Sequence, residues 1–259
     1  MHDPGCELRR ISLPRTRVNK RKEDSGFGKP RRLVDSPAAV FGNGREGAPT
    51  IREAMWSSWQ GPGLGHLRLA VRESGVVADG LVLGVAEGRP FRLSYEVRCD
   101  HYWRVRAARV GVPGEPPRVE LLSDGEGNWT GPDGRAVSYL EGCEYVDISE
   151  TPFTNSLPIR RLGLAPEGSA EIAVAYFDGA ELQPWPEPQR YTRLETGDGG
   201  GLYRFLSLDG GFSADLPVDL DGLVLDYPGL FRRVFPQPRL PRIPSRRSSQ
   251  NSSTKTFGE

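Results

Sequence analysis

Two adjacent arginines, Arg160 and Arg161, lie inside an otherwise apolar stretch, ISETPFTNSLPIRRLGLAP, which spans residues 148–166. A guanidinium group that is removed from water needs an anion or hydrogen-bond acceptors, because burying an unpaired charge is costly. The partner is either the polar headgroup of a bound ligand or a carboxylate of the protein itself. We favour the internal pairing, for which three carboxylates are candidates: Asp147, Asp215 and Asp219.

Aromatic and amide side chains near this stretch and in the strands around it could complete a binding site. Aromatic faces suit acyl chains and sugar rings, and arginine or asparagine edges suit sugar hydroxyls. For any single aromatic residue, packing in the core remains the more common role. The residues that we predict to contact a ligand are Arg160, Arg161, Trp103, Tyr95, Tyr191 and Asn155.

Groups suited to catalysis are sparse in the middle of the chain, where the histidines are His66 and His101. The string CDHYW places Cys99, Asp100 and His101 in a row, but alternate residues of a strand face opposite sides, so the three do not form a nucleophile–base–acid set. The chain has no GxSxG, HExxH or Walker string, and no GxGxxG string that enters a helix. We therefore expect a protein that is not an enzyme and has no cofactor, with a hydrolase as the less favoured alternative.

Cysteine and aspartate residues do not suggest a metal site either. We expect Cys99 and Cys143 to be buried free thiols in a reducing cytoplasm, and a disulfide between them stays open as an alternative. The carboxylates of DLPVDLDG do not have the spacing of an EF-hand loop. We expect Asp219 and Asp221 to shape a turn instead.

Charge divides the chain into three parts. Residues 1–50 hold 11 Arg/Lys against 6 Asp/Glu, and residues 235–259 hold 5 against 1, so the middle is acidic. We predict a basic disordered extension at 1–50, one domain at 51–235, and a disordered Pro/Arg/Ser-rich tail at 236–259. An acidic middle argues against nucleic-acid binding. No apolar run of 18 residues occurs, so we expect no membrane span.

Short strands separated by glycine-rich turns dominate the middle of the chain. In LRLAVR, PFRLSYEVRC and YWRVRAARV, apolar residues alternate with polar ones, which is the period of a half-buried strand. In the last string we expect Val105 and Ala107 to face one side and Arg106 and Ala108 the other. Turn residues recur between such segments, and a long helical period is lacking, so a sandwich, barrel or roll is predicted.

The opening stretch fits a helix better than a strand. Thr151 can cap a helix whose first residue is Pro152, and alternatively Thr154 or Asn155 caps it. Arg160 and Arg161 then lie near the C-terminal end, where the helix dipole favours positive charge. We expect a short helix packed against the sheet, with apolar residues on one shared side: Phe153, Leu157 and either Ile159 or Leu162.

Several strings together resemble one known family. These include WSSWQGPGLGHLRL, PFRLSYEVRCDHYWRVR, LEGCEYVDISETPFTNSLPIRRL and GFSADLPVDLDGLVLDYPGLFRR, in this order over residues 56–235. The chain resembles the putative glycolipid-binding family, a former domain of unknown function. Gly65 departs from the resemblance, because we expect a glutamate there.

The resemblance implies both a fold and a function. The implied fold is a single-domain spiral β-roll, in which a many-stranded antiparallel sheet wraps around one short central α-helix, and which forms a homodimer. The family's name comes from structural similarity to bacterial lipoprotein-localisation factors, which shelter acyl chains. The implied function is therefore non-enzymatic binding of a lipid, glycolipid or similar amphiphile in an apolar interior. The alternative is an assembly homodimer without a ligand.

Overall fold

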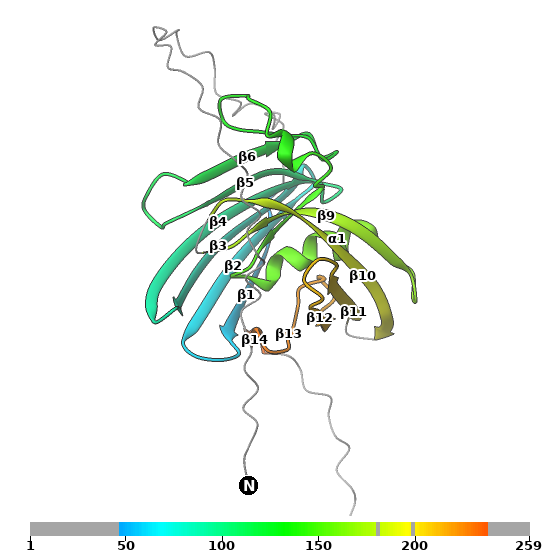
Figure 1. Cartoon of the computed structure of the whole chain (residues 1–259). Helices are drawn as coiled ribbons and strands as arrows, with labels where there is room; N and C mark the ends of the chain where they lie inside the picture. The colour runs from blue at the N-terminus through cyan, green and yellow to red at the C-terminus, as the bar shows by residue number, and fades with distance from the viewer. Residues whose placement is uncertain (1–46, 180–181, 198–199, 238–259) are drawn as a thin grey trace, which may run out of the picture.

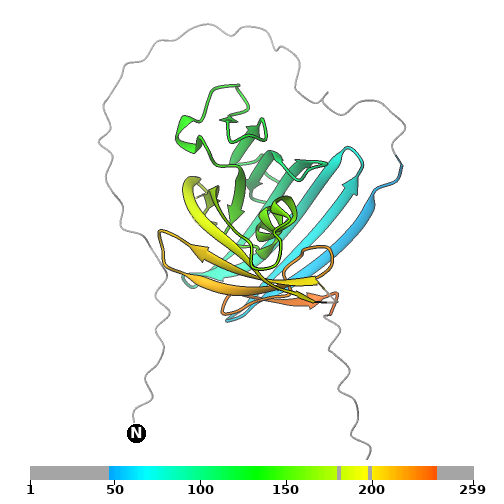
Figure 2. The same ribbon diagram turned by 90° about the vertical axis from the view of Figure 1, so that its right-hand side faces the viewer.

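Two β-sheets curl around one short helix, which lies in the hollow between them (Figures 1 and 2). This computed structural model describes residues 47–179, 182–197 and 200–237. The mainly β fold and the predicted roll of strands around a central helix are confirmed. The extension predicted for residues 1–50 and the tail predicted for 236–259 lie largely outside the described residues.

The larger sheet is an antiparallel meander that is extended at one edge by the end of the domain. Its strand order is β13-β14-β1-β2-β3-β4-β5-β6-β7, so strands β1 to β7 pair in sequence and β14 pairs with β1. The strands are β1 (Thr50–Ser58), β2 (Gly63–Arg72), β3 (Gly75–Ala86), β4 (Arg89–Asp100), β5 (Val105–Gly111), β6 (Val119–Ser123), β7 (Trp129–Thr130), β13 (Asp226–Tyr227) and β14 (Phe231–Phe235).

The smaller sheet has the order β12-β11-β10-β9-β8. Its strands are β8 (Tyr145–Ile148), β9 (Ser169–Phe177), β10 (Trp185–Gly197), β11 (Gly200–Ser207) and β12 (Ser213–Val218). The pair β8–β9 is parallel, which corrects the expectation of a wholly antiparallel sheet. The reason is the helix, because a parallel pair needs a crossover connection and the helical segment between β8 and β9 supplies it.

The helical segment begins as predicted. A one-turn 3-10 helix, η2 (Pro152–Asn155), leads directly into α1 (Ser156–Leu162), and a second short 3-10 turn, η1 (Ser138–Leu140), lies elsewhere. The Thr151 side chain accepts a hydrogen bond from the Phe153 N–H, and Pro152 takes the first position. Gly163 ends α1 at a φ of 52°, a left-handed conformation that glycine adopts without strain.

The helix packs against both sheets instead of one. Phe153 and Leu157 belong to the larger apolar cluster, which they share with the inner face of the nine-stranded sheet. Ile159 belongs to a second cluster, on the inner face of β10, β11 and β12. The shared apolar side expected for Phe153 and Leu157 is confirmed, but its extension to Ile159 is wrong, because an enclosed helix needs apolar residues on two sides.

An irregularity in register changes which alanine of β5 is inside. Cys99 pairs with Val105, Arg98 pairs with Ala107 and Val97 pairs with Ala108, so Arg106 is the extra residue of a bulge. Ala108 therefore joins Val105 in the large cluster, while Ala107 does not. The simple alternation predicted for this strand is wrong beyond Arg106.

Candidate functional site

A pocket of about 120 Å³ lies between the inner face of the large sheet and the start of η2. It is found beside the hairpins that join β1 to β2 and β3 to β4. Its walls are mainly apolar or backbone, and they include Trp56, Ser58, Gly63, Gly65, Val82, Gly84, Phe91, Glu150, Thr151, Pro152 and Phe231.

The pocket exists because three glycines occupy neighbouring inward positions of β2 and β3. Gly63 pairs with Gly84, and Gly65 pairs with Val82. A Cβ atom at Gly63 would lie 2.5 Å from the Ser58 Oγ, and one at Gly84 would lie 2.7 Å from the Phe91 ring. At Gly65 the nearest atoms would be 3.8 Å away, an ordinary contact. Only at Gly65, therefore, does the missing side chain leave space that nothing else fills.

Oxygen atoms mark the polar side of this pocket. Ser58 and Thr151 contribute hydroxyls and Glu150 a carboxylate, and the lining residues include no lysine or arginine. The Thr151 Oγ lies 3.1 Å from the Tyr95 hydroxyl, and the Ser149 hydroxyl donates to the Glu150 carboxylate at 3.2 Å. These groups can accept hydrogen bonds from a hydroxyl or an ammonium group, but they do not suit a phosphate.

A second polar group of residues is enclosed between η2 and the small sheet. Asp147 accepts a hydrogen bond from the Thr154 hydroxyl at 2.7 Å and another from the Gln189 amide at 2.8 Å. The Gln189 Oε1 is buried without a partner. Burial raises the pKa of Asp147, and burial together with the Asp147 charge raises the pKa of Glu187. This buried polar cluster therefore holds two carboxyls that resist ionisation.

Three of the predicted ligand-contact residues form contacts of the helical segment: Asn155 belongs to η2, and Tyr95 and Tyr191 meet this segment from opposite sheets. Asn155 donates its side-chain N–H to the Tyr191 hydroxyl at 2.8 Å. The Tyr95 ring stacks on Phe153 with the ring centroids 6.2 Å apart. All three predicted residues are buried, so in this structure they hold the helix between the sheets.

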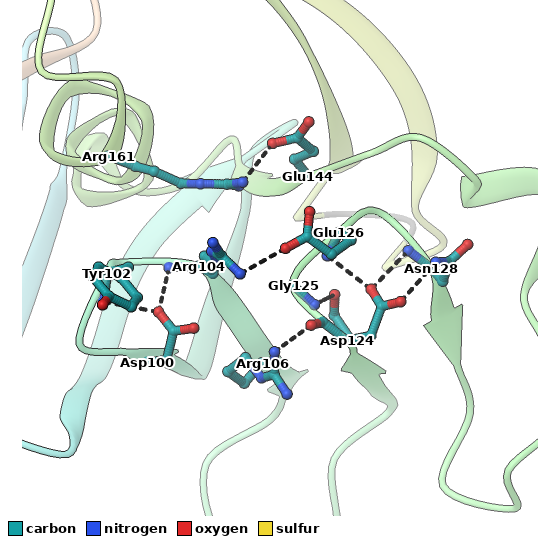
Figure 3. A network of polar contacts seen from close by, with 11 residues as sticks. Asp100, Tyr102, Arg104, Arg106, Asp124, Gly125, Glu126, Asn128, Glu144 and Arg161 are labelled. Carbon is teal, nitrogen blue, oxygen red and sulfur yellow. Dashed lines mark hydrogen bonds and ion pairs between the residues drawn. The ribbon is translucent and has the colours of Figure 1, made fainter.

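The other three predicted residues gather at the last turn of α1. The Arg160 guanidinium lies 5.0 Å from the centre of the Trp103 ring, and Arg161 forms an ion pair with Glu144 at 2.8 Å (Figure 3). Arg161 also lies over the Tyr145 ring. Trp103, Arg160 and Arg161 are therefore at the opposite end of the helical segment from the pocket.

The internal pairing favoured for the arginines is correct for Arg161, but the three candidate carboxylates are wrong. Asp147 accepts hydrogen bonds from Thr154 and Gln189 in the buried polar cluster. The other two carboxylates have arginine partners elsewhere: Asp215 pairs with Arg204 and Asp219 with Arg233. Glu144 was missed because it immediately precedes β8, and only the fold brings it to the end of α1.

A network beside Arg161 joins two surface turns (Figure 3). Arg104 pairs with Glu126 at 2.6 Å, and Arg106 donates to the Asp124 carbonyl. The Asp124 carboxylate accepts hydrogen bonds from the Asn128 amide at 2.6 Å and from the Glu126 N–H at 2.8 Å. Most of these contacts lie within the turn at residues 124–128, so we infer that the network stabilises the conformation of this turn.

None of the six predicted residues lines the pocket, whereas Gly65, noted as a departure, does. The signal in the sequence was the run GLG opposite LVLG in adjacent strands. Glycine is unfavourable within a strand, so it often marks a close approach or an open space.

The groups considered for catalysis are dispersed. Cys99 and Cys143 are both buried free thiols, as predicted, and burial raises the pKa of Cys143 to about 11. His101 is exposed, and its ring contacts that of Tyr102 at an interplanar angle of 45°. Within the described residues, His, Cys, Asp and Glu side chains form no group of three that could hold a metal ion.

Fold and pocket together define a helix-centred β-roll with a small pocket, lined by both apolar and polar groups, at one end of the helix. The chain belongs to the family described as putative glycolipid-binding, whose profile matches residues 53–233. It is similar to the crystal structure of a DUF1089 family protein from Pseudomonas aeruginosa, with 39% identity and a TM-score of 0.59. That similarity covers 69% of this chain and 92% of the other. Among curated proteins, none matches.

Proposed function

We propose that this protein binds an amphiphile without chemical conversion and that the apolar end of the ligand enters the Gly65 pocket. The observation that supports this is the unfilled inward position at Gly65, framed by Trp56, Phe91 and Phe231. A binding site of this kind needs an apolar hollow and a few polar groups at its mouth. The family name is in line with such a ligand.

The pocket favours a small apolar end over a whole acyl chain. Its volume of about 120 Å³ is close to that of a cavity that holds one benzene molecule, about 150 Å³. The oxygen atoms of Ser58, Glu150 and Thr151, with no cation among the lining residues, favour a hydroxyl-rich headgroup over a phosphate. We infer a ligand with a sugar-like polar part that stays near the mouth.

The remaining groups support a non-enzymatic role in a reducing compartment. The cysteines are buried, which keeps both thiols away from solvent, and we propose the cytoplasm as the compartment. No helix among the described residues is long and apolar enough to cross a membrane. Of the predicted ligand-contact residues, Tyr95 supports the site from outside its lining, because its hydroxyl lies 3.1 Å from that of the lining residue Thr151.

We expect hexyl glucoside to raise the melting temperature of the wild-type protein and not that of Gly65→Leu. A leucine at position 65 fills the pocket, because its Cβ finds room and its remaining atoms occupy the space for the ligand. At 100 times the Kd, a bound ligand adds about 2.7 kcal/mol, which corresponds to roughly 5–10 °C for a domain of this size. Thermal unfolding monitored by circular dichroism measures the difference.

Two controls accompany this titration. Ala70→Leu places the same side chain elsewhere on β2. Leu67 and Leu69 face the core, so Ala70 faces the opposite side of the sheet from the pocket, and this change should leave the thermal response to hexyl glucoside intact. Hexyl phosphate should give a smaller rise than hexyl glucoside. An equal response of Gly65→Leu and wild type would refute the site.

A second candidate role, assembly as a homodimer, has its own observation. Five large apolar side chains are exposed on the outer face of the large sheet or at its edge: Leu64, Leu81, Leu83, Val85 and Phe235. Leu64 and Leu83 are directly paired, and Phe235 pairs with Met55. Contiguous exposed apolar groups of this kind mark contact surfaces. We propose that this outer apolar face joins two copies of the chain.

Charge on this face should separate the two copies. We expect Leu83→Arg to shift the sedimentation coefficient from that of a dimer to that of a monomer in analytical ultracentrifugation, because a guanidinium would be buried opposite Arg92 without a carboxylate partner. Arg92→Gln, a change at the residue paired with Leu83, should remain dimeric. A wild-type protein that sediments as a monomer at high concentration would exclude this interface.

A further inference from the structure

Two turns at the far end of the molecule from the Gly65 pocket present the most exposed large apolar side chains among the described residues. Leu220 lies between β12 and β13 and is 76% exposed, and Tyr102 lies between β4 and β5 and is 62% exposed. Isolated apolar residues are commonly exposed, so exposure alone does not indicate a function. The residues around these two side chains must be considered as well.

Both turns are clamped in the same manner. Asp219 accepts hydrogen bonds from the N–H groups of Asp221 and Leu223, at 3.0 Å and 2.9 Å. Asp100 accepts hydrogen bonds from the N–H groups of Tyr102 and Arg104, at 2.9 Å and 3.0 Å (Figure 3). An aspartate side chain that binds backbone N–H groups in this way stabilises the backbone of its turn. Each of the two turns therefore presents its apolar side chain from an ordered backbone.

Arg160 joins the two turns. Its guanidinium packs over Trp103, which adjoins Tyr102, and its Nη1 lies 3.5 Å from the Leu220 carbonyl oxygen. Within the described residues, Arg160 has no carboxylate partner, whereas Arg52 nearby is paired with Asp221 at 2.9 Å. The Arg160 guanidinium, with N–H groups available for an anion, therefore lies beside the exposed side chains of Tyr102 and Leu220.

We propose that this edge, made of Tyr102, Arg160 and Leu220, docks the protein on the surface of a phospholipid bilayer. Leucine inserts into the boundary between headgroups and acyl chains, tyrosine suits that boundary with its apolar ring and polar hydroxyl, and the guanidinium binds a lipid phosphate. Leucine, tyrosine and arginine thus suit the acyl-chain boundary, the interface and the phosphate layer of a bilayer, respectively.

Charges around the edge do not oppose this contact. Asp219 and Asp221 are neutralised by Arg233 and Arg52. Asp100, the carboxylate two residues before Tyr102, has its Oδ1 turned to two backbone N–H groups. We favour a bilayer over a protein partner because the Arg160 guanidinium, which has no carboxylate partner among the described residues, lies between two apolar side chains and complements a layer of lipid phosphates above acyl chains.

The edge and the Gly65 pocket lie at opposite ends of the helical segment, because Thr151 and Pro152 line the pocket and Arg160 is in the last turn of α1. Docking on a membrane does not require the pocket to be filled. The two proposals can therefore fail independently.

Flotation of the full-length protein with phosphatidylcholine vesicles at physiological salt tests the docking. These vesicles carry no net charge, so the basic residues outside the described part of the chain contribute little. We expect Leu220→Ser to weaken partitioning about tenfold, and Leu220→Ser with Tyr102→Ser to abolish it, since the removed apolar area drives insertion. Arg160→Gln should weaken binding less than either change.

Leu230→Ser serves as the matched control, because it removes an exposed leucine from the turn between β13 and β14, next to Phe231 of the pocket. It should float as the wild-type protein does, and circular dichroism should show that all variants are folded. Wild-type protein that stays out of the vesicle fraction would overturn the proposal. Partitioning of the double variant equal to that of wild type would overturn it as well.

Discussion

Replacing Arg233 by methionine should lower the free energy of unfolding by about 3 kcal/mol. The side chain is buried, with 4% of the residue exposed. It donates to the Val224 carbonyl from Nε at 3.2 Å and from Nη2 at 2.8 Å, and its Nη1 pairs with Asp219 at 3.1 Å. Methionine keeps the apolar bulk over Trp56 but leaves the Asp219 carboxylate without its cation. Urea denaturation measures the loss.

Arg204→Met is the matched control for this prediction. Arg204 pairs with Asp215 through two contacts of 2.7 Å and 2.9 Å, which are as short as those of Arg233, but both side chains are about half exposed. Exposed ion pairs contribute little, so the loss should stay below about 1 kcal/mol. Similar losses for Arg204→Met and Arg233→Met would show that burial does not set the strength of these pairs.

Replacing Asp147 by leucine should cost about 2–4 kcal/mol, because the Thr154 hydroxyl and the Gln189 amide both lose their acceptor. Asp147→Asn should cost less than about 1 kcal/mol. In that variant the Gln189 side chain can turn its Oε1, which has no partner, toward the new amide. Equal losses for the two variants would contradict the role assigned to these hydrogen bonds.

We also expect the free energy of unfolding of the wild-type protein to depend on pH through these carboxyls. Burial raises the pKa of Asp147 and of Glu187 in the folded protein, so both carboxyls hold their protons more tightly than in the unfolded chain. Their favourable contribution is complete below the ordinary carboxyl pKa and is lost as the pH rises through the raised folded value. Across that rise, wild type should lose more stability than Asp147→Asn, as denaturation at a series of pH values will show. If the unfolding free energies of wild type and Asp147→Asn changed in parallel with pH, the pKa of Asp147 would not be raised by folding, which would contradict this prediction.

Local patterns in the sequence predicted most of the fold. The alternation in LRLAVR and PFRLSYEVRC indicated the inward faces of β2 and β4, and Thr151 with Pro152 indicated the start of the helical segment. The bulge at Arg106 could not be predicted, because it depends on how β5 registers against β4. The parallel pairing of β8 with β9 likewise depends on where the helix returns the chain.

The candidate site was less accessible to sequence reasoning. Aromatic and charged residues attract attention, yet Tyr191 and Asn155 bind each other, and Arg161 binds Glu144. The pocket depends on an absent side chain at Gly65 and on which residues stand opposite it in neighbouring strands. Whether a glycine is covered by an aromatic ring, as Gly80 is by Tyr95, or left open, as Gly65 is, follows only from the packed sheets.

The pocket at Gly65 also limits what the fold can do. The interior is otherwise occupied by the helical segment, whose apolar residues fill the clusters on both sheets. A ligand longer than a ring or a short alkyl end must therefore extend out of the pocket. If so, binding should depend on the terminal part of the apolar chain more than on its total length.

Native mass spectrometry of the wild-type protein and of Gly65→Leu, both purified from the natural host, tests the binding proposal most directly. We predict that the wild-type protein retains one amphiphile per chain, that organic extraction yields a hydroxyl-rich headgroup on it, and that Gly65→Leu is folded but free of it. A wild-type protein that never carries a ligand would contradict amphiphile binding. The same bound mass on Gly65→Leu would show that the ligand binds elsewhere.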